Sequence, residues 1–421
     1  MQKTNIYLER YAYSKSYLGH KPKENTGIIV VIPCYYEPDL VSSLISINNC
    51  HSQCPVEIIV IINASEIDSE EIKEHNINTY QEVLGWSDSI QSTNKNFHFI
   101  LENESPKKHA GVGLARKIGM DEAVRMFETI NNSDGVILCF DADSTCEENL
   151  LSEVWSHFLL NPKSPGCSIN FEHPLTGNLD HQIYRGITFY ELHLRYYVDA
   201  LKYAGFPYAY HTIGSSMAVR SSAYQKQGGM NRKKAGEDFY FLHKIIPLGN
   251  FGEVNSTAIY PSPRASDRVP FGTGRAVGEW LAGEQEDYLT YHFQIFEDLK
   301  IFITQVDSYF MTNEKALKES MLDLPRSISD FLNSLNFELI LKEVQDQSSN
   351  LDSFRKRFFQ WFDGFRVLKY VHFARDSFYP NISILEGVDW LFSVHSLTTT
   401  PELKNKLIKL RRFDKFGAKV L

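Results

Sequence analysis

GVILCFDAD, residues 135–143, is an apolar run that ends in two carboxylates, Asp141 and Asp143. Such a run predicts a buried β-strand, and side chains two residues apart at its end project from the same edge of a sheet. Ligands of α/β proteins bind at this carboxyl edge. Hard oxygen ligands suit Mn²⁺ or Mg²⁺, which can neutralise a phosphate leaving group. We therefore expect Asp141 and Asp143 to bind a metal; a solvated acidic turn is the alternative.

The length and composition indicate a globular protein with more than one structural unit. The chain has 421 residues, of which 43% are hydrophobic and 23% are charged. A chain of this length exceeds what one compact core accommodates. Its formal charge of -9 argues against a general nucleic-acid binder. We therefore expect two or three units and no nucleic-acid partner.

The cysteines and the hydropathy pattern indicate a reduced, cytoplasmic setting. No metal-ligand or disulfide framework connects the six cysteines. Residues 1–10 are polar, and no apolar run reaches the ~18 residues of a membrane span. The basic, amphipathic stretch 403–412 is expected to dock on the protein as a terminal helix. The alternative is a peripheral contact with the inner face of the membrane.

Strand-like and helical patterns alternate through the first half of the chain. Continuous β-branched runs at 27–33, 56–62 and 136–140 predict strands that are covered on both faces. The expected helices lie after the capping residue Asp39, at 67–77 and at 113–130, and a further short strand lies at 97–101. This alternation predicts an α/β fold with a doubly wound, mostly parallel sheet and right-handed crossovers.

The second half of the chain is dominated by predicted helices instead of alternating strands and helices. We expect an N-terminal extension at 1–26, an α/β domain at 27–278 and a C-terminal helical region at 279–421. The last region is rich in aromatic residues at helical spacing, as in 291–310 and 354–373. Such stripes are typical of helix–helix cores, and a membrane-facing surface is the alternative.

Several motifs follow one another in the order found in one enzyme family. They are Ile32-Pro33-Cys34-Tyr35-Tyr36-Glu37, Asn63-Ala64-Ser65, GVGLARKIG at 111–119, Asp141-Ala142-Asp143, GSSMAVR at 214–220 and Gly236-Glu237-Asp238. Through these motifs residues 27–238, about half of the chain, resemble the GT-A glycosyltransferases of family 2. The resemblance implies a GT-A fold and metal-dependent transfer of a sugar from a nucleotide-diphosphate sugar to an acceptor hydroxyl, with inversion.

The resemblance also implies roles for individual residues. Asp141 and Asp143 would bind Mn²⁺ or Mg²⁺, and Asp238 would act as the general base. Glu237 would orient the acceptor or share that role, although acids at a helix start are also favoured by the helix dipole alone. The nucleotide would contact Pro33, Tyr35, Glu37, Asn63, Ser65, Gly113, Arg116 and Asp141. Gly214 and Ser215 would contact the phosphates or the acceptor. Independently of the resemblance, we expect Arg268 and Arg275 to contact the phosphates, and His211 to be a metal ligand or a contact of the acceptor. For His211, a hydrogen-bonded structural role is the alternative.

The chain departs from the family pattern in three places. Asn63 stands where many relatives have an aspartate that pairs with uracil, so the base of the donor is not specified. Lys117 replaces the usual asparagine. The Gln-x-x-Arg-Trp signature and the flanking membrane helices of processive synthases are missing, which predicts a non-processive enzyme. These motifs do not specify the oligomeric state or the acceptor, whether a saccharide, a lipid-linked molecule or a small molecule.

An arginine-rich segment at 262–275 is a second candidate for phosphate chemistry. Its arginines, Arg264, Arg268 and Arg275, alternate with Gly, Pro and Ser. Guanidinium and backbone N–H groups both bind phosphate oxygens, and glycines can serve as hinges. We expect this loop to close over the donor diphosphate as a lid; a plain surface connection is the alternative.

Three other functions share part of this pattern. A retaining GT-A glycosyltransferase has the same metal motif. A nucleotidyltransferase usually carries a Gly-rich signature with Lys or Arg after its first strand, where this chain has Cys34-Tyr35-Tyr36-Glu37. A nucleotide-sugar-binding scaffold without turnover would have no need of Asp141, Asp143 and Asp238.

Overall fold

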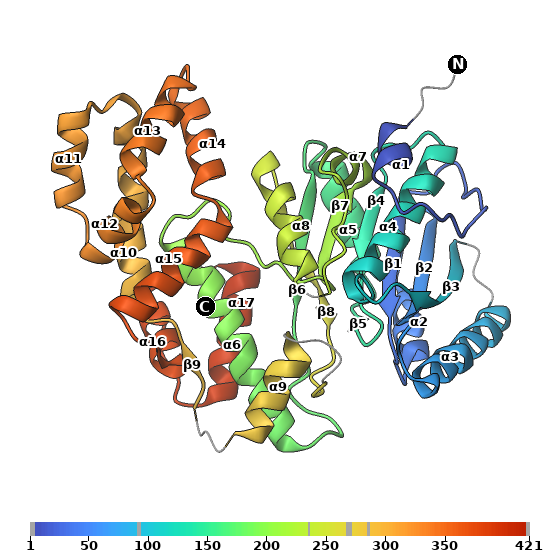
Figure 1. Cartoon of the computed structure of the whole chain (residues 1–421). Helices are drawn as coiled ribbons and strands as arrows, with labels where there is room; N and C mark the ends of the chain where they lie inside the picture. The colour runs from blue at the N-terminus through green and yellow to red at the C-terminus, as the bar shows by residue number, and fades with distance from the viewer. Residues whose placement is uncertain (1–4, 91–93, 235, 267–271, 284–286, 418–421) are drawn as a thin grey trace. The chain divides into compact units, whose positions relative to one another are not determined.

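The structure, a computed structural model, forms two compact units (Figure 1). The first, the α/β unit, comprises Met1–Gly177 and Thr212–Arg275. The second, the helical unit, comprises Asn178–His211 and Ala276–Leu421. The structure describes residues 5–90, 94–234, 236–266, 272–283 and 287–417. The chain thus leaves the α/β unit after residue 177 and returns to it at residue 212.

An eight-stranded sheet lies in the α/β unit, in the order β3-β2-β1-β4-β7-β6-β8-β5. The strands are β1 Ile28–Cys34, β2 Val56–Ser65, β3 Lys95–Ser105, β4 Val136–Cys139, β5 Thr145–Cys146, β6 Gly166–Phe171, β7 Met217–Arg220 and β8 Gly252–Tyr260. β3, β2, β1 and β4 are parallel neighbours, and β6 is parallel to β8. β7 runs antiparallel to β4 and β6, and β5 antiparallel to β8. The predicted mostly parallel α/β sheet is confirmed.

Helices cover both faces of this sheet, which explains why β1, β2 and β4 are buried along their whole length. The helices of the unit are α1 Ile6–Arg10, α2 Leu40–Asn49, α3 Glu70–Ser89, α4 Val112–Thr129, α5 Leu150–Leu160, α7 Ser221–Lys226, α8 Glu237–Ile245 and the 3₁₀ turn η1 Ile246–Leu248. α4 covers one face and approaches it closely at Gly119, where a Cβ would lie 2.5 Å from Val31 Cγ1 and 2.4 Å from Ile61 Cδ1. On the other face, apolar side chains of α2, α3 and α5 join the strands in one hydrophobic core.

The helical unit is built around α6. Its elements are α6 His181–Tyr203, β9 Leu289–Thr290, α10 Gln294–Gln305, η2 Val306–Met311, α11 Glu314–Leu322, α12 Arg326–Ser334, α13 Phe337–Asp346, α14 Leu351–Trp361, α15 Gly364–Ser377, β10 Ile382–Ser383, α16 Ile384–Val394 and α17 Leu403–Phe416; α9 Thr273–Ala282 spans the boundary between the units. α6 packs against α10, α16 and α17. The division therefore differs from the predicted domains 27–278 and 279–421, because α6 belongs with the C-terminal helices.

The basic stretch at 403–412 lies in α17, which docks on α6. Leu407 and Leu410 are fully buried there. Arg411 donates to the buried carboxylate of Glu191 at 2.8 and 2.6 Å, and Arg195 donates to the same carboxylate at 2.8 Å. The terminal helix is thus docked on the protein, as the sequence predicted. Among the described residues, no helix combines the length and the apolar character needed to cross a membrane.

Other sequence predictions need correction in their details. β2 continues beyond the predicted strand at 56–62 to Ser65, because β3 is long enough to pair with it. The predicted helix at 354–373 is two helices, since the Asp363 side chain caps α15 by accepting a 2.9 Å hydrogen bond from the Arg366 N–H. All six cysteines are free thiols, as predicted.

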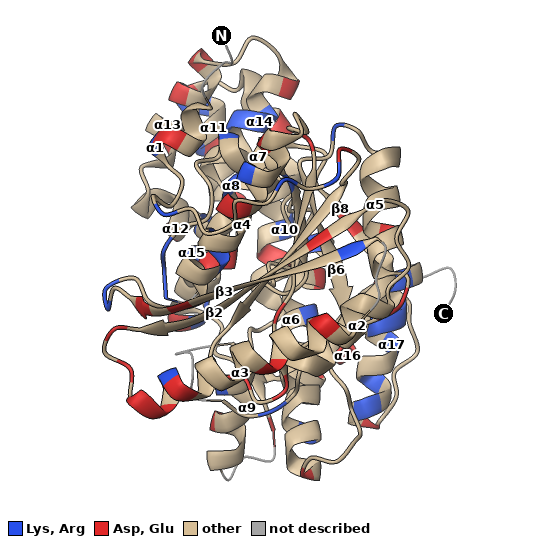
Figure 2. Ribbon diagram, turned by 90° about the vertical axis from the view of Figure 1, so that its right-hand side faces the viewer, with Lys and Arg blue, Asp and Glu red and all other residues tan. Residues whose placement is uncertain are grey.

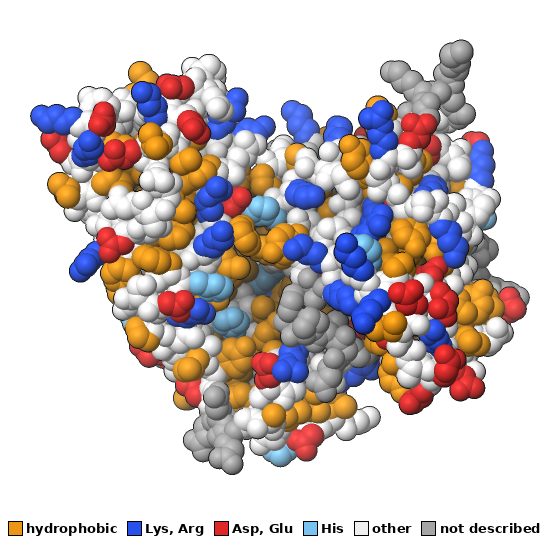
Figure 3. Space-filling view, in the orientation of Figure 1, with side chains coloured by type: hydrophobic (Ala, Val, Ile, Leu, Met, Phe, Trp, Pro, Cys, Tyr) orange, Lys and Arg blue, Asp and Glu red, His pale blue; other side chains and the backbone are white. Residues whose placement is uncertain are grey.

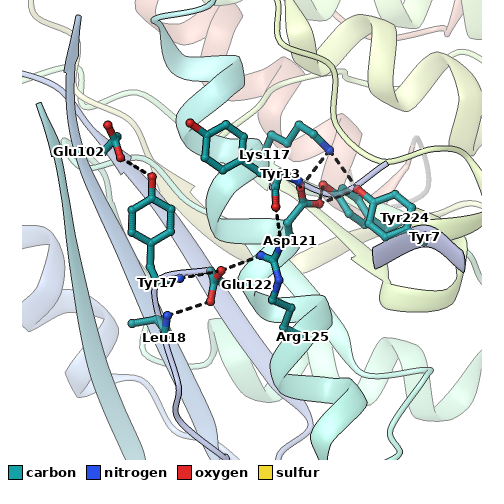
Figure 4. Close-up of polar contacts among 10 residues, drawn as sticks. All are labelled: Tyr7, Tyr13, Tyr17, Leu18, Glu102, Lys117, Asp121, Glu122, Arg125 and Tyr224. Carbon is teal, nitrogen blue, oxygen red and sulfur yellow. Dashed lines mark hydrogen bonds and ion pairs between the residues drawn. The ribbon is translucent and has the colours of Figure 1, made fainter. Parts of the chain in front are cut away.

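The N-terminal segment before β1 packs on α4, as Figure 4 shows. Asp121 of α4 is fully buried and accepts hydrogen bonds from the hydroxyls of Tyr7 at 2.6 Å and Tyr224 at 2.7 Å. It also accepts from the Tyr13 N–H at 2.7 Å and pairs with Lys117 Nζ at 3.0 Å. One carboxylate thus connects the N-terminal segment to the helix that begins at the predicted nucleotide-binding motif.

Two further acids hold the same segment. Glu122 is fully buried and accepts from the backbone N–H groups of Tyr17 at 3.2 Å and Leu18 at 3.1 Å. Glu102 of β3 accepts from the Tyr17 hydroxyl and, at 3.0 Å, from Lys15 Nζ. The predicted extension at 1–26 is therefore, in its described part, packed on α4 and β3 of the α/β unit.

We expect Asp121→Asn to destabilise the protein strongly. The amide keeps the size of the side chain but removes the charge that balances the buried ammonium of Lys117. Breaking one side of a buried ion pair costs about 3–5 kcal/mol. Urea unfolding followed by circular dichroism measures this loss. The double variant Asp121→Asn with Lys117→Met should be less destabilised than Asp121→Asn alone, because it no longer contains a buried ammonium without a counterion.

The matched control is the surface pair of Lys73 and Glu104, whose charged atoms lie 2.9 Å apart and in which the Glu104 side chain is 69% exposed. Glu104→Gln should change the free energy of unfolding by less than about 1 kcal/mol, since surface pairs contribute little. A loss in Asp121→Asn no larger than that in Glu104→Gln would contradict the importance of the buried network.

Candidate active site

The Asp141-Ala142-Asp143 motif follows β4 in a tight turn at the carboxyl edge of the sheet. The Ser144 N–H donates to the Asp141 carbonyl at 3.1 Å, and the Ser43 hydroxyl of α2 donates to the Ala142 carbonyl at 2.7 Å. The side chains of Asp141 and Asp143 are 37% and 26% exposed. Both carboxylates therefore lie where the sequence predicted them, on a backbone that is fixed and within reach of a ligand.

A buried arginine joins this motif to a second one. Arg116, in the first turns of α4, is 2% exposed, and its Nη2 lies 2.6 Å from Asp141 Oδ1. Its Nη1 forms an ion pair with Glu237 of α8. Gly214 leaves room for the guanidinium, since a Cβ there would lie 2.5 Å from Nη1. Four sequence motifs of the resemblance thus meet at one side chain.

The start of α8 presents its two acids differently. Glu237 is 3% exposed and is bound to Arg116, whereas Asp238 is partly exposed. Asp238 Oδ2 accepts a 2.9 Å hydrogen bond from the Gly214 N–H. Glu237 thus forms an internal ion pair, and its role toward an acceptor stays a prediction. Asp238 is the acid of this pair that a substrate can reach.

Burial controls the protonation of both acids. It raises the pKa of Glu237 to about 7, an effect that Arg116 opposes and the neighbouring Asp238 adds to. Burial also raises the pKa of Asp238, again opposed by Arg116. Burial alone would lower the pKa of Arg116, but Asp141 and Glu237 together raise it above its usual range. The arginine is therefore a permanent cation, and the two acids are poised closer to neutrality than ordinary carboxyl groups.

A second arginine, Arg264, lies at the same edge of the sheet. Its Nη2 forms an ion pair with Glu37 and lies 3.5 Å from Asp143 Oδ2. Glu37, in the loop after β1, is 3% exposed. The sequence placed Glu37 at the nucleotide and Arg264 in a lid, but it did not predict that they pair. The order of the strands explains only why Glu37 and Asp143 lie close enough to share Arg264, because β1 and β4 are neighbours.

A buried asparagine that was not predicted from the sequence fixes the backbone at the strand ends where the nucleotide is predicted to bind. Asn76 of α3 is fully buried and accepts from the Tyr36 N–H at 3.2 Å. Its amide donates to the Asn63 carbonyl and to Asn103 Oδ1, each at 3.0 Å. The ends of β1, β2 and β3 are thereby connected through one side chain. A polar residue on the buried face of a predicted helix is the signal that could have revealed it.

The other predicted nucleotide contacts occupy the same unit. Pro33 is buried near the end of β1, and Tyr35 follows it in a partly buried loop. Ser65 is the last residue of β2. Gly113 lies in the first turn of α4, where a Cβ would come within 2.2 Å of the Lys233 carbonyl, so a close backbone approach requires glycine here. Ser215 is buried next to Gly214.

Of the three remaining predicted contacts, His211 and Arg275 belong to the described part of the chain. His211 belongs to the helical unit, where burial and the nearby cations Arg195 and Lys202 lower its pKa far below its usual range. Arg268 lies outside the described residues. Arg275 is exposed in the first turn of α9 rather than in a loop, because the helix begins at Thr273.

The charges at this edge fit a divalent cation. The carboxyl groups are those of Glu37, Asp141, Asp143, Glu237 and Asp238, and the cations that face them are Arg116 and Arg264. Among the described residues at this edge, five carboxyl groups face two guanidinium groups, so a bound divalent cation would reduce the repulsion of an anionic diphosphate. Asp141 and Asp143 are hard oxygen donors of the kind that Mn²⁺ and Mg²⁺ prefer.

Acidic residues also gather away from this site, on α3 (Figure 2). Their group forms the red area at the lower right of the space-filling view (Figure 3). The exposed members are Glu70, Glu71, Glu74, Glu82 and Asp88. A surface of this sign repels the phosphate backbone of a nucleic acid.

Known proteins offer only a distant comparison. No family model matches the chain, and no curated protein matches its sequence. S. aureus TarS 1–349 in complex with UDP-GlcNAc is 13% identical, with a TM-score of 0.40, over 78% of this chain and 89% of that chain. S. aureus TarS 1–349 without a named ligand is 14% identical, with a TM-score of 0.39, over 80% and 92%. Its complex with UDP is 13% identical, with a TM-score of 0.37, over 80% and 92%. At these identities and TM-scores the likeness assigns neither family nor function.

Glu237 should make stability depend on pH. Its pKa rises from 4.5 to about 7 on folding, so the folded protein holds this proton more tightly than the unfolded chain. The stability that protonated Glu237 contributes is full below pH 4.5 and is lost as the pH rises to about 7. Glu237→Gln has no such proton. Between pH 4.5 and about 7, the free energy of unfolding of Glu237→Gln should therefore rise relative to that of the wild type by on the order of 1–3 kcal/mol. Urea unfolding at a series of pH values measures this change.

The control for this series is Glu82→Gln on the exposed face of α3. Its free energy of unfolding should follow that of the wild type at every pH. If the difference between Glu237→Gln and the wild type were the same at pH 4.5 and pH 8, the raised pKa of Glu237 would be refuted.

Proposed function

We propose that the α/β unit is a metal-dependent, inverting glycosyltransferase that moves a sugar from a nucleotide-diphosphate sugar to an acceptor hydroxyl. The Arg116 bridge is the observation that carries this proposal, because it joins Asp141 at the end of β4 to the acidic start of α8. Transfer from a diphosphate to a hydroxyl needs charge stabilisation at the leaving group and a base at the acceptor. Both kinds of group lie around this arginine.

Asp141 and Asp143 are the residues that would hold Mn²⁺ or Mg²⁺. Their partial exposure and the surplus of carboxylates at this edge support the assignment. When bound, the metal neutralises charge on the leaving diphosphate. Arg264, whose Nη2 lies 3.5 Å from Asp143, adds a second positive charge at the same place.

The nucleoside would bind beside the metal, at the ends of β1 and β2. Tyr35 offers an aromatic side chain there, and Asn63 and Ser65 offer polar groups. Asn76 fixes the backbone at both strand ends, which keeps the site in one shape before the donor arrives. A site that is ordered in advance loses less conformational entropy on binding.

Asp238 is the general base in this proposal. Its carboxyl group is partly exposed, and the Gly214 N–H holds Oδ2 in one orientation. Burial raises its pKa, and a carboxylate with a raised pKa is a stronger proton acceptor. The base takes the proton of the acceptor hydroxyl as that oxygen attacks the sugar. Glu237 has a positioning role, since it holds Arg116 and with it the start of α8.

Asp143→Asn and Asp238→Asn should separate the metal from the base. Asp143→Asn should abolish both transfer and metal-dependent nucleotide binding, because it removes a charged ligand of the metal.

Asp238→Asn should lower the transfer rate by a factor of ~100 or more and leave donor affinity unchanged, because a general base lowers the activation barrier without binding the donor. A panel of nucleotide sugars with Mn²⁺, assayed by nucleoside diphosphate release and by calorimetry, gives both quantities.

Asp180→Asn is a matched control, since this exposed aspartate caps α6 in the helical unit. It should leave both donor affinity and rate unchanged. Full turnover of the wild type in excess chelator would refute the metal assignment. Equal losses of donor binding and rate in Asp238→Asn would show that this acid serves structure rather than proton transfer.

A further inference from the structure

Two histidines and a glutamate converge at the opposite edge of the sheet from the candidate active site. Glu57 is the second residue of β2, so it lies at the amino end of that strand. It pairs in register with Asn96 of β3, and His98 lies two residues farther along the same strand, hence on the same face. The third member, His20, comes from the N-terminal segment before β1.

The donor atoms of these three residues are close enough to share one ion. His98 Nε2 lies 2.7 Å and His20 Nε2 lies 3.8 Å from Glu57 Oε2. All three donor atoms lie within 4.8 Å of one another. Ligands at ~2.1 Å from a tetrahedral zinc are about 3.4 Å apart. The observed separations lie on both sides of this value, so small side-chain rotations would complete the geometry.

The surroundings of Glu57 call for a positive charge. Its side chain is fully buried, and in the described part of the chain the groups that contact its carboxylate are the two histidines and the Asn96 amide, not a lysine or an arginine. A buried carboxylate without a cation is costly. Two imidazoles and a carboxylate form the ligand set of many zinc sites with an open fourth position. The His20 side chain is 42% exposed, so water can supply that ligand.

Asn96 has the position of an outer-shell partner. Its Nδ2 donates to Glu57 Oε1 at 3.1 Å, which leaves Oε2 turned to both histidines. Such partners orient a ligand, and their loss typically lowers metal affinity by 10–100-fold.

We propose that His20, Glu57 and His98 form a zinc site that fastens the N-terminal segment to β2 and β3. The segment is already held through Glu102 and Glu122, and a metal would add an attachment between His20 and the sheet. An ion that binds the folded protein alone raises its apparent stability by mass action. The site is separate from the Asp141 motif, so it does not depend on the proposed transferase activity.

The test uses the full chain in an Asp141→Asn, Asp143→Asn background, so that the active-site acids do not contribute. Metal-depleted protein is titrated with Zn²⁺ by calorimetry, and with Co²⁺ to record the visible absorption of a tetrahedral site. We expect one equivalent to bind and to raise the melting temperature. His20→Ala and His98→Ala should lower the zinc affinity by more than about 100-fold, beyond the cost of an outer-shell partner, and Asn96→Ala by about 10–100-fold.

His51→Ala, which removes an exposed histidine of the same unit, is the control and should bind zinc like its parent. His20 is itself exposed, so His20→Ala should still fold. A loss of zinc affinity in this variant can therefore be assigned to the missing ligand. Absence of zinc binding in the parent protein would overturn the proposal. So would zinc affinity that survives unchanged in both His20→Ala and His98→Ala.

Discussion

The guanidinium of Arg116 is a full positive charge in the interior of the α/β unit, and Asp141 and Glu237 neutralise it from opposite sides. A buried charge without partners is costly, so β4, α4 and α8 must keep their relative positions for as long as the protein is folded. Asp238 stays beside the metal motif for the same reason, since it follows Glu237 in the first turn of α8. The geometry of the candidate active site therefore follows from one ion-pair network.

The surrounding structure supports the helix that carries this arginine. α4 lies against β1 and β2 through Gly119, and the N-terminal segment is bound to its middle through Asp121 and Glu122. A loss of this segment would remove partners from two fully buried carboxylates. Residues far from the strand edge thus influence the site by holding α4, and the proposed zinc site would add one more attachment of the same segment.

Local patterns in the sequence sufficed for the sheet and for the acids at its edge. Continuous β-branched runs predicted β1, β2 and β4, and Asp141 and Asp143 follow β4 as expected. Side-chain pairing over long distances was not predictable, because neither residue of a pair such as Arg116 and Glu237 is unusual in its local context. The break between α14 and α15 could have been predicted, since Asp363 is a residue type that commonly caps the start of a helix. The place of α6 was not, because its apolar face fits either unit.

A double-mutant cycle between Arg116 and Glu237 tests the central claim most directly. Arg116→Met, Glu237→Gln and the double variant are unfolded in urea at pH 8, where Glu237 with its pKa of about 7 is ionised. If the ion pair joins the two motifs, the double variant loses far less stability than the sum of the single variants, with a coupling energy above about 2 kcal/mol. Losses that add within about 0.5 kcal/mol would contradict the account.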